Sequence, residues 1–523
     1  MQLGASMTVL LAGVLLMLTA NVVESVPLTK RTPQFVTLPL KRMVPVGGLH
    51  PQIYLQQQIN RGVRRLARMT GRAGPSDAEL VANLERRVLA IEGPEGLERR
   101  YNRMGVPSSR DEGTVLEKRF NRQGVPRRNQ QRGIQSLKKG KGGRNGNGGN
   151  AGNGNAGAAG SATSAATPVN DVTFANAPTD SNSLGLDIES QDEGYLATIQ
   201  MGTPPRDFLI LMDSGSSDFW VGGENCQTVS TTSAADNVDN CGAHNFLGTA
   251  SSSSFVDSGK VFNVTYGTGQ VGGTIITDDV TIANLTLPAH TFGAASTESI
   301  DFSGSATPFD GLMGLAQQGL SQQGVPTPVE SLFQANLIPA QITSFKISRL
   351  ADNLNDGEVT FGGLDTSKFD STTLATVDNV NTEGFWEGAI DSVSLNGADL
   401  GLSGRTAILD TGTTLMVLPA ADAQTILSGV DGAQSDGQGG FVVPCDTTAS
   451  LALTFGGQEF TIEPTDFAIQ PVGGAAANNL CTCGITSGDI GGATEWLVGD
   501  VFLKNAYFSV DESKNTISLA KLV

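Results

Sequence analysis

The sequence predicts an all-β protein with two related halves. Short runs rich in Val, Ile and Leu alternate with Gly, Ser and Thr, a pattern typical of strands joined by tight turns. Hydrophobic residues make up 39% of the 523-residue chain, enough for a sizeable core. The most informative observation is a repeated segment, found at 210–217 and 407–414, in which an apolar run ends in Asp, a hydroxyl residue, Gly and a second hydroxyl residue.

The two copies place Asp213 and Asp410 in the same setting. An apolar run bounded by Gly indicates a buried strand that enters a tight turn, so each carboxylate is held rigidly beside the backbone. Two such turns facing each other would place two acids at one centre, an arrangement that can activate water. A third Asp-Ser-Gly, at 257–259, follows a Ser run without an apolar lead-in, and we interpret it as a chance match on a loop.

Charge is distributed unevenly along the chain. Residues 1–150 contain 25 Lys and Arg against 10 Asp and Glu, whereas residues 151–523 contain 9 against 42. A basic front and an acidic body attract each other at neutral pH. A basic tail that binds nucleic acid is the alternative interpretation, but it fits poorly with the secretion that the N-terminus predicts.

The N-terminus predicts a signal peptide over residues 1–25. Residues 8–18 form an apolar stretch that is followed by small residues up to Ser25, and this stretch is too short to span a bilayer. No later segment is apolar enough to cross a membrane. We therefore expect a soluble product that is secreted, with an extracellular or vacuolar destination and no membrane partner.

The remaining chain divides by composition into four segments. Residues 26–135 are basic, 136–184 form a linker rich in Gly, Asn and Ala, and 185–355 and 356–523 contain one Asp turn each. Ser76 and Glu79 predict a capping box, and the apolar residues of the helix that follows are Leu80, Val81, Leu84, Val88 and Leu89. The segment 98–107 recurs as 117–126, with dibasic pairs that indicate processing sites or, alternatively, a duplicated solvated helix end.

The numbers of Cys and His indicate the redox compartment and argue against some classes of catalysis. Five Cys favour an oxidising compartment, in which Cys226 and Cys241 can close a short loop and Cys445 can pair with Cys481 or Cys483. Only three His are present, which argues against zinc hydrolysis and a Ser-His-Asp triad. No metal or organic cofactor is implied.

Two triplets match the N-glycosylation pattern. They begin at Asn263 and Asn284. Such triplets also arise often by chance, so both interpretations stay open.

Further motifs surround the two Asp turns. Residues 202–205 read Gly-Thr-Pro-Pro before the first Asp, Trp220 follows it in a Phe-Trp-Val segment, 265–269 read Thr-Tyr-Gly-Thr-Gly, and 499–503 read Gly-Asp-Val-Phe-Leu. With these motifs, residues 190–523 resemble a pepsin-family aspartic protease precursor of the fungal secreted type. The resemblance implies a bilobal pepsin-like acid protease fold, in which two related β lobes flank a cleft for an extended peptide. It also implies a monomeric endopeptidase that acts on protein or peptide substrates.

The resemblance assigns the catalytic dyad to Asp213 and Asp410. Two carboxylates a few ångströms apart cannot both ionise easily, so they share one proton over an acidic range. The ionised carboxylate takes a proton from water while the protonated one donates to the substrate carbonyl, giving a tetrahedral diol without a covalent intermediate.

Neighbouring residues take supporting roles in this interpretation. Gly215 and Gly412 let the backbone approach the carboxylates, and the Ser214 and Thr411 hydroxyls brace the turns against each other. The outer carboxylate oxygens are expected to accept hydrogen bonds from two further hydroxyls, those of Ser216 and Thr413.

The resemblance also implies a flap. It contains Tyr266, Gly267 and Thr268, and it closes over the substrate, with Trp220 as the partner of the tyrosine hydroxyl. The alternative is that both aromatic residues are ordinary sheet residues.

Residues 26–135 are expected to act as the chain's own inhibitor. Their cations would hold down an acidic cleft at neutral pH and release it when the carboxylates protonate in acid. Residues 35–42 resemble the strand-like start of family prosegments. We expect the mature chain to start between about Arg128 and Leu186.

Two other function classes compete with an acid endopeptidase. A pepsin-like protein without activity, serving as an inhibitor or binding module, usually carries a damaged Asp turn, and here both turns are intact. A glycosidase with paired carboxylates would lack this symmetric setting.

Overall fold

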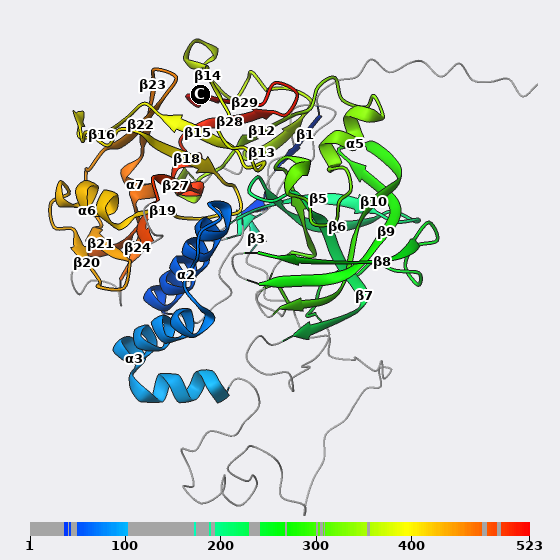
Figure 1. Ribbon diagram of the computed structural model, residues 1–523, viewed down its shortest axis with the longest axis horizontal. Helices are drawn as coiled ribbons and strands as arrows, with labels where there is room; N and C mark the ends of the chain where they lie inside the picture. The colour runs from blue at the N-terminus through cyan, green and yellow to red at the C-terminus, as the bar shows by residue number, and fades with distance from the viewer. Residues whose placement is uncertain are drawn as a thin grey trace, which may run out of the picture.

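The computed structural model describes residues 36–39, 41–42, 50–102, 172–173, 188–189 and 194–523, apart from short gaps at 230–240, 267–268, 300–301, 304–306, 308, 353–355, 473–478 and 489–492. Strands dominate these residues and form two lobes with helix α2 between them (Figure 1). The predicted bilobal all-β architecture is confirmed. The predicted signal peptide, nearly all of the linker and the second dibasic segment lie outside the described residues.

An eight-stranded sheet forms the N-terminal lobe. Its spatial order is β2 (Lys41–Arg42), β5 (Tyr195–Met201), β6 (Arg206–Asp213), β11 (Gly311–Gly314), β7 (Phe219–Val229), β10 (Leu285–Ser299), β9 (Gln270–Ile282) and β8 (Val256–Thr265). Strand β11 runs parallel to β6, with Gly314 opposite Asp213. The apolar segment that the sequence places after the first Asp turn therefore lies directly beside it.

The C-terminal lobe repeats this arrangement around a five-stranded sheet. Its order is β15 (Glu387–Ile390), β18 (Arg405–Leu409), β27 (Glu495–Val498), β19 (Met416–Pro419) and β26 (Ile485–Gly488). Strand β27 runs parallel to β18, with Val498 opposite Leu409, so the second Asp turn is also flanked by a buried apolar strand.

Three smaller sheets complete the described strands. One consists of β17 (Ala398–Asp399), β16 (Ser392–Leu395), β22 (Leu451–Phe455) and β23 (Gln458–Ile462), and another of β20 (Gln434–Ser435), β21 (Phe441–Pro444), β25 (Leu480–Cys483) and β24 (Ala468–Pro471). The third is the pair of β3 (Val172–Thr173) and β4 (Ile188–Glu189).

A six-stranded antiparallel sheet connects the two halves. Its order is β1 (Val36–Pro39), β13 (Glu358–Phe361), β12 (Ile342–Lys346), β28 (Tyr507–Asp511), β29 (Thr516–Ala520) and β14 (Ala375–Asp378). Strands β12 and β13 pair across the boundary that the sequence places at residue 355. Strand β1 comes from the basic front segment and forms an edge of this sheet, so residues 36–39 are strand as expected.

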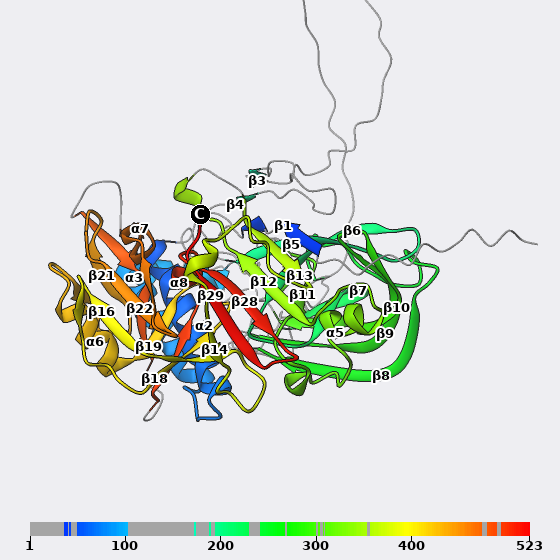
Figure 2. The same ribbon diagram turned by 90° about the horizontal axis from the view of Figure 1, so that it is seen from above.

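Helix α2 (Pro51–Met69) fills the space between the lobes, against the C-terminal lobe (Figures 1 and 2). The His50 ring accepts a hydrogen bond from the Gln52 N–H at its start, and Pro51 occupies the first turn, where its missing N–H costs nothing. Its apolar face joins the main core through Leu55, Ile59, Val63 and Leu66.

Helix α3 (Asp77–Asn102) packs on α2 and is interrupted at Gly93, whose φ is 68°, next to Pro94. The predicted capping box is present, because Ser76 N donates to Glu79 Oε2 and Glu79 N donates to Ser76 Oγ. Leu80 and Val88 are buried.

Two of the apolar residues of this helix lie on its exposed side. The structure leaves Val81 42% exposed and Leu89 43% exposed, and it buries Arg87. An ion pair and amide partners described below accommodate that charge.

The other helices are short. They are η1 (Gln318–Leu320), α5 (Pro328–Gln334), η2 (Leu350–Asp352), η3 (Ser371–Thr373), α6 (Ala420–Ser428), α7 (Pro464–Phe467) and α8 (Asp500–Leu503). Among the helices that the structure describes, none combines the length and apolar character that a membrane span requires.

Candidate active site

The two Asp turns have matching hydrogen bonds. Both carboxylates are fully buried, Asp213 at the end of β6 and Asp410 directly after β18. Asp213 accepts from Gly215 N at 3.0 Å and from Ser216 Oγ at 2.6 Å. Asp410 accepts from Gly412 N at 2.9 Å and from Thr413 Oγ1 at 2.6 Å. Each carboxylate thus has one oxygen bound to a backbone N–H and the other to a hydroxyl.

Ser214 and Thr411 lock the two turns together. Ser214 N donates to Thr411 Oγ1 at 2.9 Å, and Thr411 N donates to Ser214 Oγ at 3.0 Å. The two hydroxyls then donate into the opposite strands, from Ser214 to Leu409 O and from Thr411 to Met212 O. All four polar groups are satisfied across the lobe boundary, so neither turn can shift without breaking bonds to the other.

Each Asp turn approaches the opposite carboxylate so closely that only glycine fits at positions 215 and 412. A Cβ on Gly215 would collide with Asp410 Oδ1, and a Cβ on Gly412 would collide with Asp213 Oδ1. Any side chain at either position would push the opposing carboxylate away. Both positions therefore keep the two acids together.

Helix α2 brings a cation onto this pair. Arg65 Nη2 donates to Asp213 Oδ1 at 2.5 Å and to Asp410 Oδ1 at 2.8 Å, while its Nε lies 2.5 Å from Asp410 Oδ2. One nitrogen thus contacts the inner oxygens of both acids, which places those oxygens at a single centre. The Arg65 side chain is 12% exposed.

Burial and the charge of the opposite partner shift the pKa values of Asp410 and Arg65 in opposite directions. Burial raises the pKa of Asp410 above its ordinary value; the Arg65 charge opposes that shift, and the Asp213 charge adds to it. Burial alone would lower the pKa of Arg65, but the charges of Asp213 and Asp410 raise it. The guanidinium is therefore a permanent cation between two acids.

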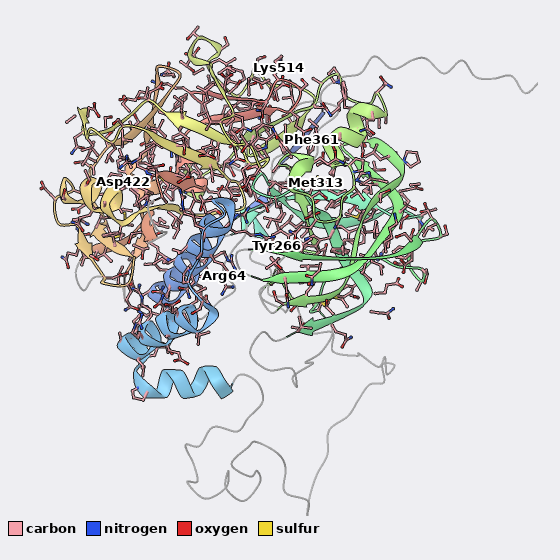
Figure 3. The ribbon with its side chains drawn as sticks, in the orientation of Figure 1. Arg64, Tyr266, Met313, Phe361, Asp422 and Lys514 are labelled. Carbon is pink, nitrogen blue, oxygen red and sulfur yellow. A yellow bond between two sulfur atoms is a disulfide. The ribbon has the colours of Figure 1, made fainter. Side chains whose placement is uncertain are left out.

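Tyr266 lies at the end of the β8–β9 hairpin, where the N-terminal lobe approaches α2 (Figure 3). Trp220 Nε1 donates to its hydroxyl at 2.8 Å, and the Phe302 ring contacts both aromatic rings edge-on. Burial raises the pKa of Tyr266 well above its ordinary value, so the phenol stays neutral. Gly267 and Thr268, the other two expected flap residues, lie outside the described residues.

A pocket remains between α2 and the β8–β9 hairpin. Its walls come from α2, the first Asp turn, the hairpin, η1 with the residues after it, and the segment before β15; the lining includes Arg65, Arg68, Met69, Ser216, Asp218, Tyr266, Leu320 and Phe385. Asp218 is buried there and accepts from Ser321 Oγ, Gln322 N and Gln323 N.

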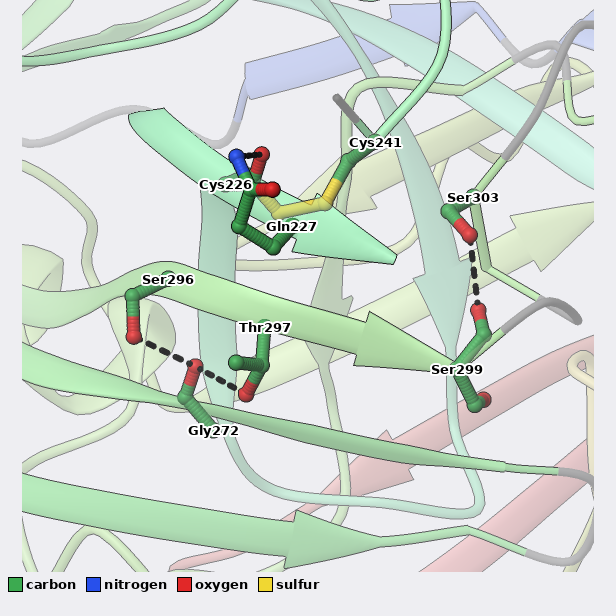
Figure 4. The surroundings of a disulfide bond; sticks show 8 residues. All are labelled: Cys226, Gln227, Cys241, Gly272, Ser296, Thr297, Ser299 and Ser303. Carbon is green, nitrogen blue, oxygen red and sulfur yellow. Dashed lines mark hydrogen bonds between the residues drawn. A yellow bond between two sulfur atoms is a disulfide. The ribbon is translucent and has the colours of Figure 1, made fainter. Parts of the chain in front are cut away.

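The structure contains two disulfides. Cys226 pairs with Cys241, and Cys445 pairs with Cys481 rather than with Cys483, which is left as a buried thiol. Side-chain and backbone hydrogen bonds surround the first disulfide, among them Thr297 to Gly272 O (Figure 4). Among the described residues, one grouping could ligate a metal, Cys226, Cys241 and Glu298. Its two sulfurs are bonded to each other, so this group does not fit a metal.

Three other expectations can be placed on the structure. Asn263 and Asn284 are both exposed. The Asp-Ser-Gly at 257–259 lies within strand β8, at a register shift, so the expectation of a loop is wrong. Its residues are exposed and no buried strand leads into them.

Comparison with known proteins identifies the family. The family described as eukaryotic aspartyl protease matches residues 194–522, which include both Asp turns.

The chain belongs to the eukaryotic aspartyl protease family.

Individual relatives agree with this assignment. A Trichophyton verrucosum protein named probable aspartic-type endopeptidase CTSD is 37% identical over 348 residues, which are 66% of this chain and 64% of that protein. The aspartic-type endopeptidase ctsD of Aspergillus fumigatus is 33% identical over 67% of this chain and 70% of its own length. Pepsin A of Bos taurus is 31% identical over 63% of this chain and 84% of its own. The chain thus matches less than two-thirds of the length of the first of these aspartyl protease relatives.

Three cations of the front segment that form ion pairs with the body were not predicted from the sequence. They are Arg65, Arg72 and Arg87, which pair with the dyad, Glu495 and Asp436. The apolar spacing of Leu55, Ile59 and Leu66 could have identified α2. It could not have distinguished Arg65 from its neighbours, because that choice depends on the rotation of the helix in the cleft.

Proposed function

We propose that this chain is the precursor of a secreted aspartic endopeptidase that hydrolyses peptide bonds in protein or peptide substrates at acidic pH. Asp213 and Asp410 form the catalytic dyad. The observation that carries the proposal is the symmetric pair of turns, in which two buried carboxylates share one cation and each outer oxygen accepts from a hydroxyl.

The dyad performs the chemistry with a water in the position that the Arg65 nitrogen now takes. Two adjacent buried acids retain one proton between them, since the second ionisation would place like charges side by side. The ionised acid accepts a proton from the water, whose oxygen attacks the peptide carbonyl carbon. The protonated acid donates to the carbonyl oxygen, and the diol then collapses as the leaving nitrogen is protonated.

The hydroxyls and the flap position these groups. Ser216 and Thr413 fix the outer oxygens, so the inner oxygens face the substrate. Tyr266, held by Trp220, closes over the bound peptide and excludes water. No step needs a metal or a cofactor.

The front segment is the proposed inhibitor. Three contacts support this role: α2 occupies the cleft with Arg65 on the dyad, Arg72 binds Glu495, and Arg87 binds Asp436. At neutral pH the carboxylates are charged and retain the cations. Their protonation in acid weakens the attraction and releases the segment.

The remaining features follow from this assignment. The chain enters the secretory route through residues 1–25, acts as a monomer outside the cell or in a vacuole, and carries glycans at Asn263 and Asn284. Its mature form begins between about Arg128 and Leu186. N-terminal sequencing of the secreted protein tests this boundary, and an intact start at Val26 with full activity would contradict it.

The test is digestion of a protein substrate by the processed enzyme across acidic pH, with and without pepstatin. Asp213→Asn and Asp410→Asn should each lower kcat by about a thousandfold, because each removes one of the two proton-transfer groups. Asp257→Asn is the matched control, since it changes the same motif at an exposed position and should leave kcat unchanged. A wild-type protein that binds peptides without cutting them at any acidic pH would instead favour the inactive, peptide-binding alternative.

A further inference from the structure

The end of helix α2 fixes the position of Arg72, which forms an ion pair with Glu495. Arg72 N donates to Ala67 O at 2.9 Å and Gly71, whose φ is 62°, donates to Arg68 O. This pattern is a Schellman motif, which fixes the chain direction directly after a helix. The Arg72 guanidinium then donates two parallel hydrogen bonds to the Glu495 carboxylate, at 2.7 and 3.0 Å.

Strand β27 fixes the distance between Glu495 and the dyad. Glu495 begins this strand, whose last residue, Val498, accepts a hydrogen bond from Asp410 N at 3.0 Å. Three residues of strand separate the two positions, or about 10 Å at a strand's rise per residue. An extended substrate advances by the same rise, so this distance corresponds to about three substrate residues from the scissile bond.

A second carboxylate, that of Glu387, lies near the Arg72–Glu495 pair. Glu387 begins β15, two residues after Phe385, which lines the pocket that also contains Arg65 and Tyr266. Thr406 Oγ1 and Asn381 Nδ2 donate to its two oxygens, so Glu387 is fixed. Its charge reaches Arg72, whose pKa is raised first by the hydrogen bonds that Arg72 donates to Glu495 and further by the charge of Glu387. Two acids thus act on one guanidinium.

We propose that Glu495, supported by Glu387, forms a substrate subsite for an Arg side chain about three residues from the cleaved bond. This inference rests on the proposed function. In the precursor, Arg72 occupies the subsite as a substrate side chain would. Removal of residues 50–102 uncovers Glu495 on the strand that flanks the second Asp turn, while its backbone remains fixed between β18 and β19.

The geometry explains why the subsite prefers a positively charged side chain. A guanidinium matches a carboxylate with two parallel bonds, which a neutral side chain cannot form. Both partners remain partly exposed, at 29% for the Arg72 side chain and 23% for Glu495, so the gain is modest and comparable to that of a surface ion pair. We expect a preference of about fivefold rather than an absolute requirement.

The experiment uses processed enzyme and a series of peptides that share one cleavable bond. A single Arg, or Gln as its neutral counterpart, is moved through the positions on either side of that bond, and the ratio of kcat/KM is measured. One position about three residues from the bond should show the Arg preference. Glu495→Gln should lower the Arg-to-Gln ratio of kcat/KM at that position to about one, and Glu459→Gln, on the edge strand β23, should retain the preference.

A binding measurement separates this subsite from catalysis. Asp213→Asn protein should bind the preferred Arg peptide about fivefold more tightly than its Gln counterpart, and Glu495→Gln should remove that difference. If wild-type enzyme cuts nothing but this difference is present, the proposed function fails and the subsite stands. No preference at any position in either measurement, or a preference that survives Glu495→Gln, would overturn the subsite.

Discussion

Arg87 of the front segment lies 2.7 Å from Asp436 in the C-terminal lobe, and the two side chains are only 3% and 11% exposed. Arg87 also donates to the side-chain oxygens of Gln52 and Gln56 on α2. One guanidinium therefore ties α3 to α2 and both helices to the body.

Arg87→Ala should loosen the docking of the proposed propeptide. It leaves the Asp436 charge partly buried and unpaired, which costs about 3 kcal/mol. We expect a lower thermal midpoint for the precursor and faster cleavage of α3 by an added protease. Arg86→Ala removes the same charge from the exposed side of α3 and should change neither measurement; equal effects of both variants would contradict a specific role for Arg87.

Arg65→Ala should speed conversion of the precursor. The two carboxylates lose their shared donor, and a charged hydrogen bond worth about 1.5 kcal/mol corresponds to a rate increase of roughly tenfold. The rate of appearance of the processed form, followed by gel electrophoresis at a fixed mildly acidic pH, measures this effect. Arg65→Lys keeps a cation in place and should convert at a rate closer to that of the wild type. Slower conversion of Arg65→Ala would argue against inhibition by this contact.

Release of the proposed propeptide should occur in two stages as the pH falls. Burial raises the pKa of Asp410, so Arg65 begins to lose one partner above the ordinary carboxyl range. At Glu495, burial would raise the pKa, but hydrogen bonds from Arg72 and from the backbone lower it. The stabilisation from that pair is complete above the ordinary Glu pKa and is lost as pH falls through the lowered value.

Glu495→Gln should therefore remove the second, more acidic stage. The pH profile of propeptide dissociation, followed by tryptophan fluorescence of the precursor, should keep its first stage and lose its steepness below the ordinary Glu range. An unchanged profile would show that Arg72 does not contribute to retention.

Thr411→Val should damage the active site without unfolding the protein. It leaves Ser214 N and Met212 O unpaired in a buried position, at a cost of about 2 kcal/mol. Displacement of the turns should lower kcat by roughly tenfold. Thr411→Ser restores the hydroxyl and should recover both kcat and the thermal midpoint, whereas a Thr411→Ser variant as impaired as Thr411→Val would point to packing instead.

The local motifs of the fold were legible in the sequence because they are set by neighbours along the chain. The Asp turns and the capping box at Ser76 each depend on residue types at a fixed short spacing.

The contacts of the front segment could not be read in the same way. Arg65 and Arg87 are buried against carboxylates that lie 148 to 349 residues away, and helical periodicity marks cations as solvent-facing. The exposed positions of Val81 and Leu89 and the buried position of Arg87 depend on how α3 lies against α2 and the body. The choice of Cys481 as the partner of Cys445 likewise depends on the pairing of β21 with β25, which places Cys481 opposite Val443.

Cys483 lies two residues beyond the Cys445–Cys481 disulfide and is fully buried. Burial raises the pKa of its thiol to about 12. Thiol–disulfide exchange requires a thiolate, which is scarce at such a pKa and scarcer still in acid. The odd cysteine therefore does not reshuffle the bridge beside it, and the protein retains its covalent connectivity throughout the acidic range in which it is proposed to work.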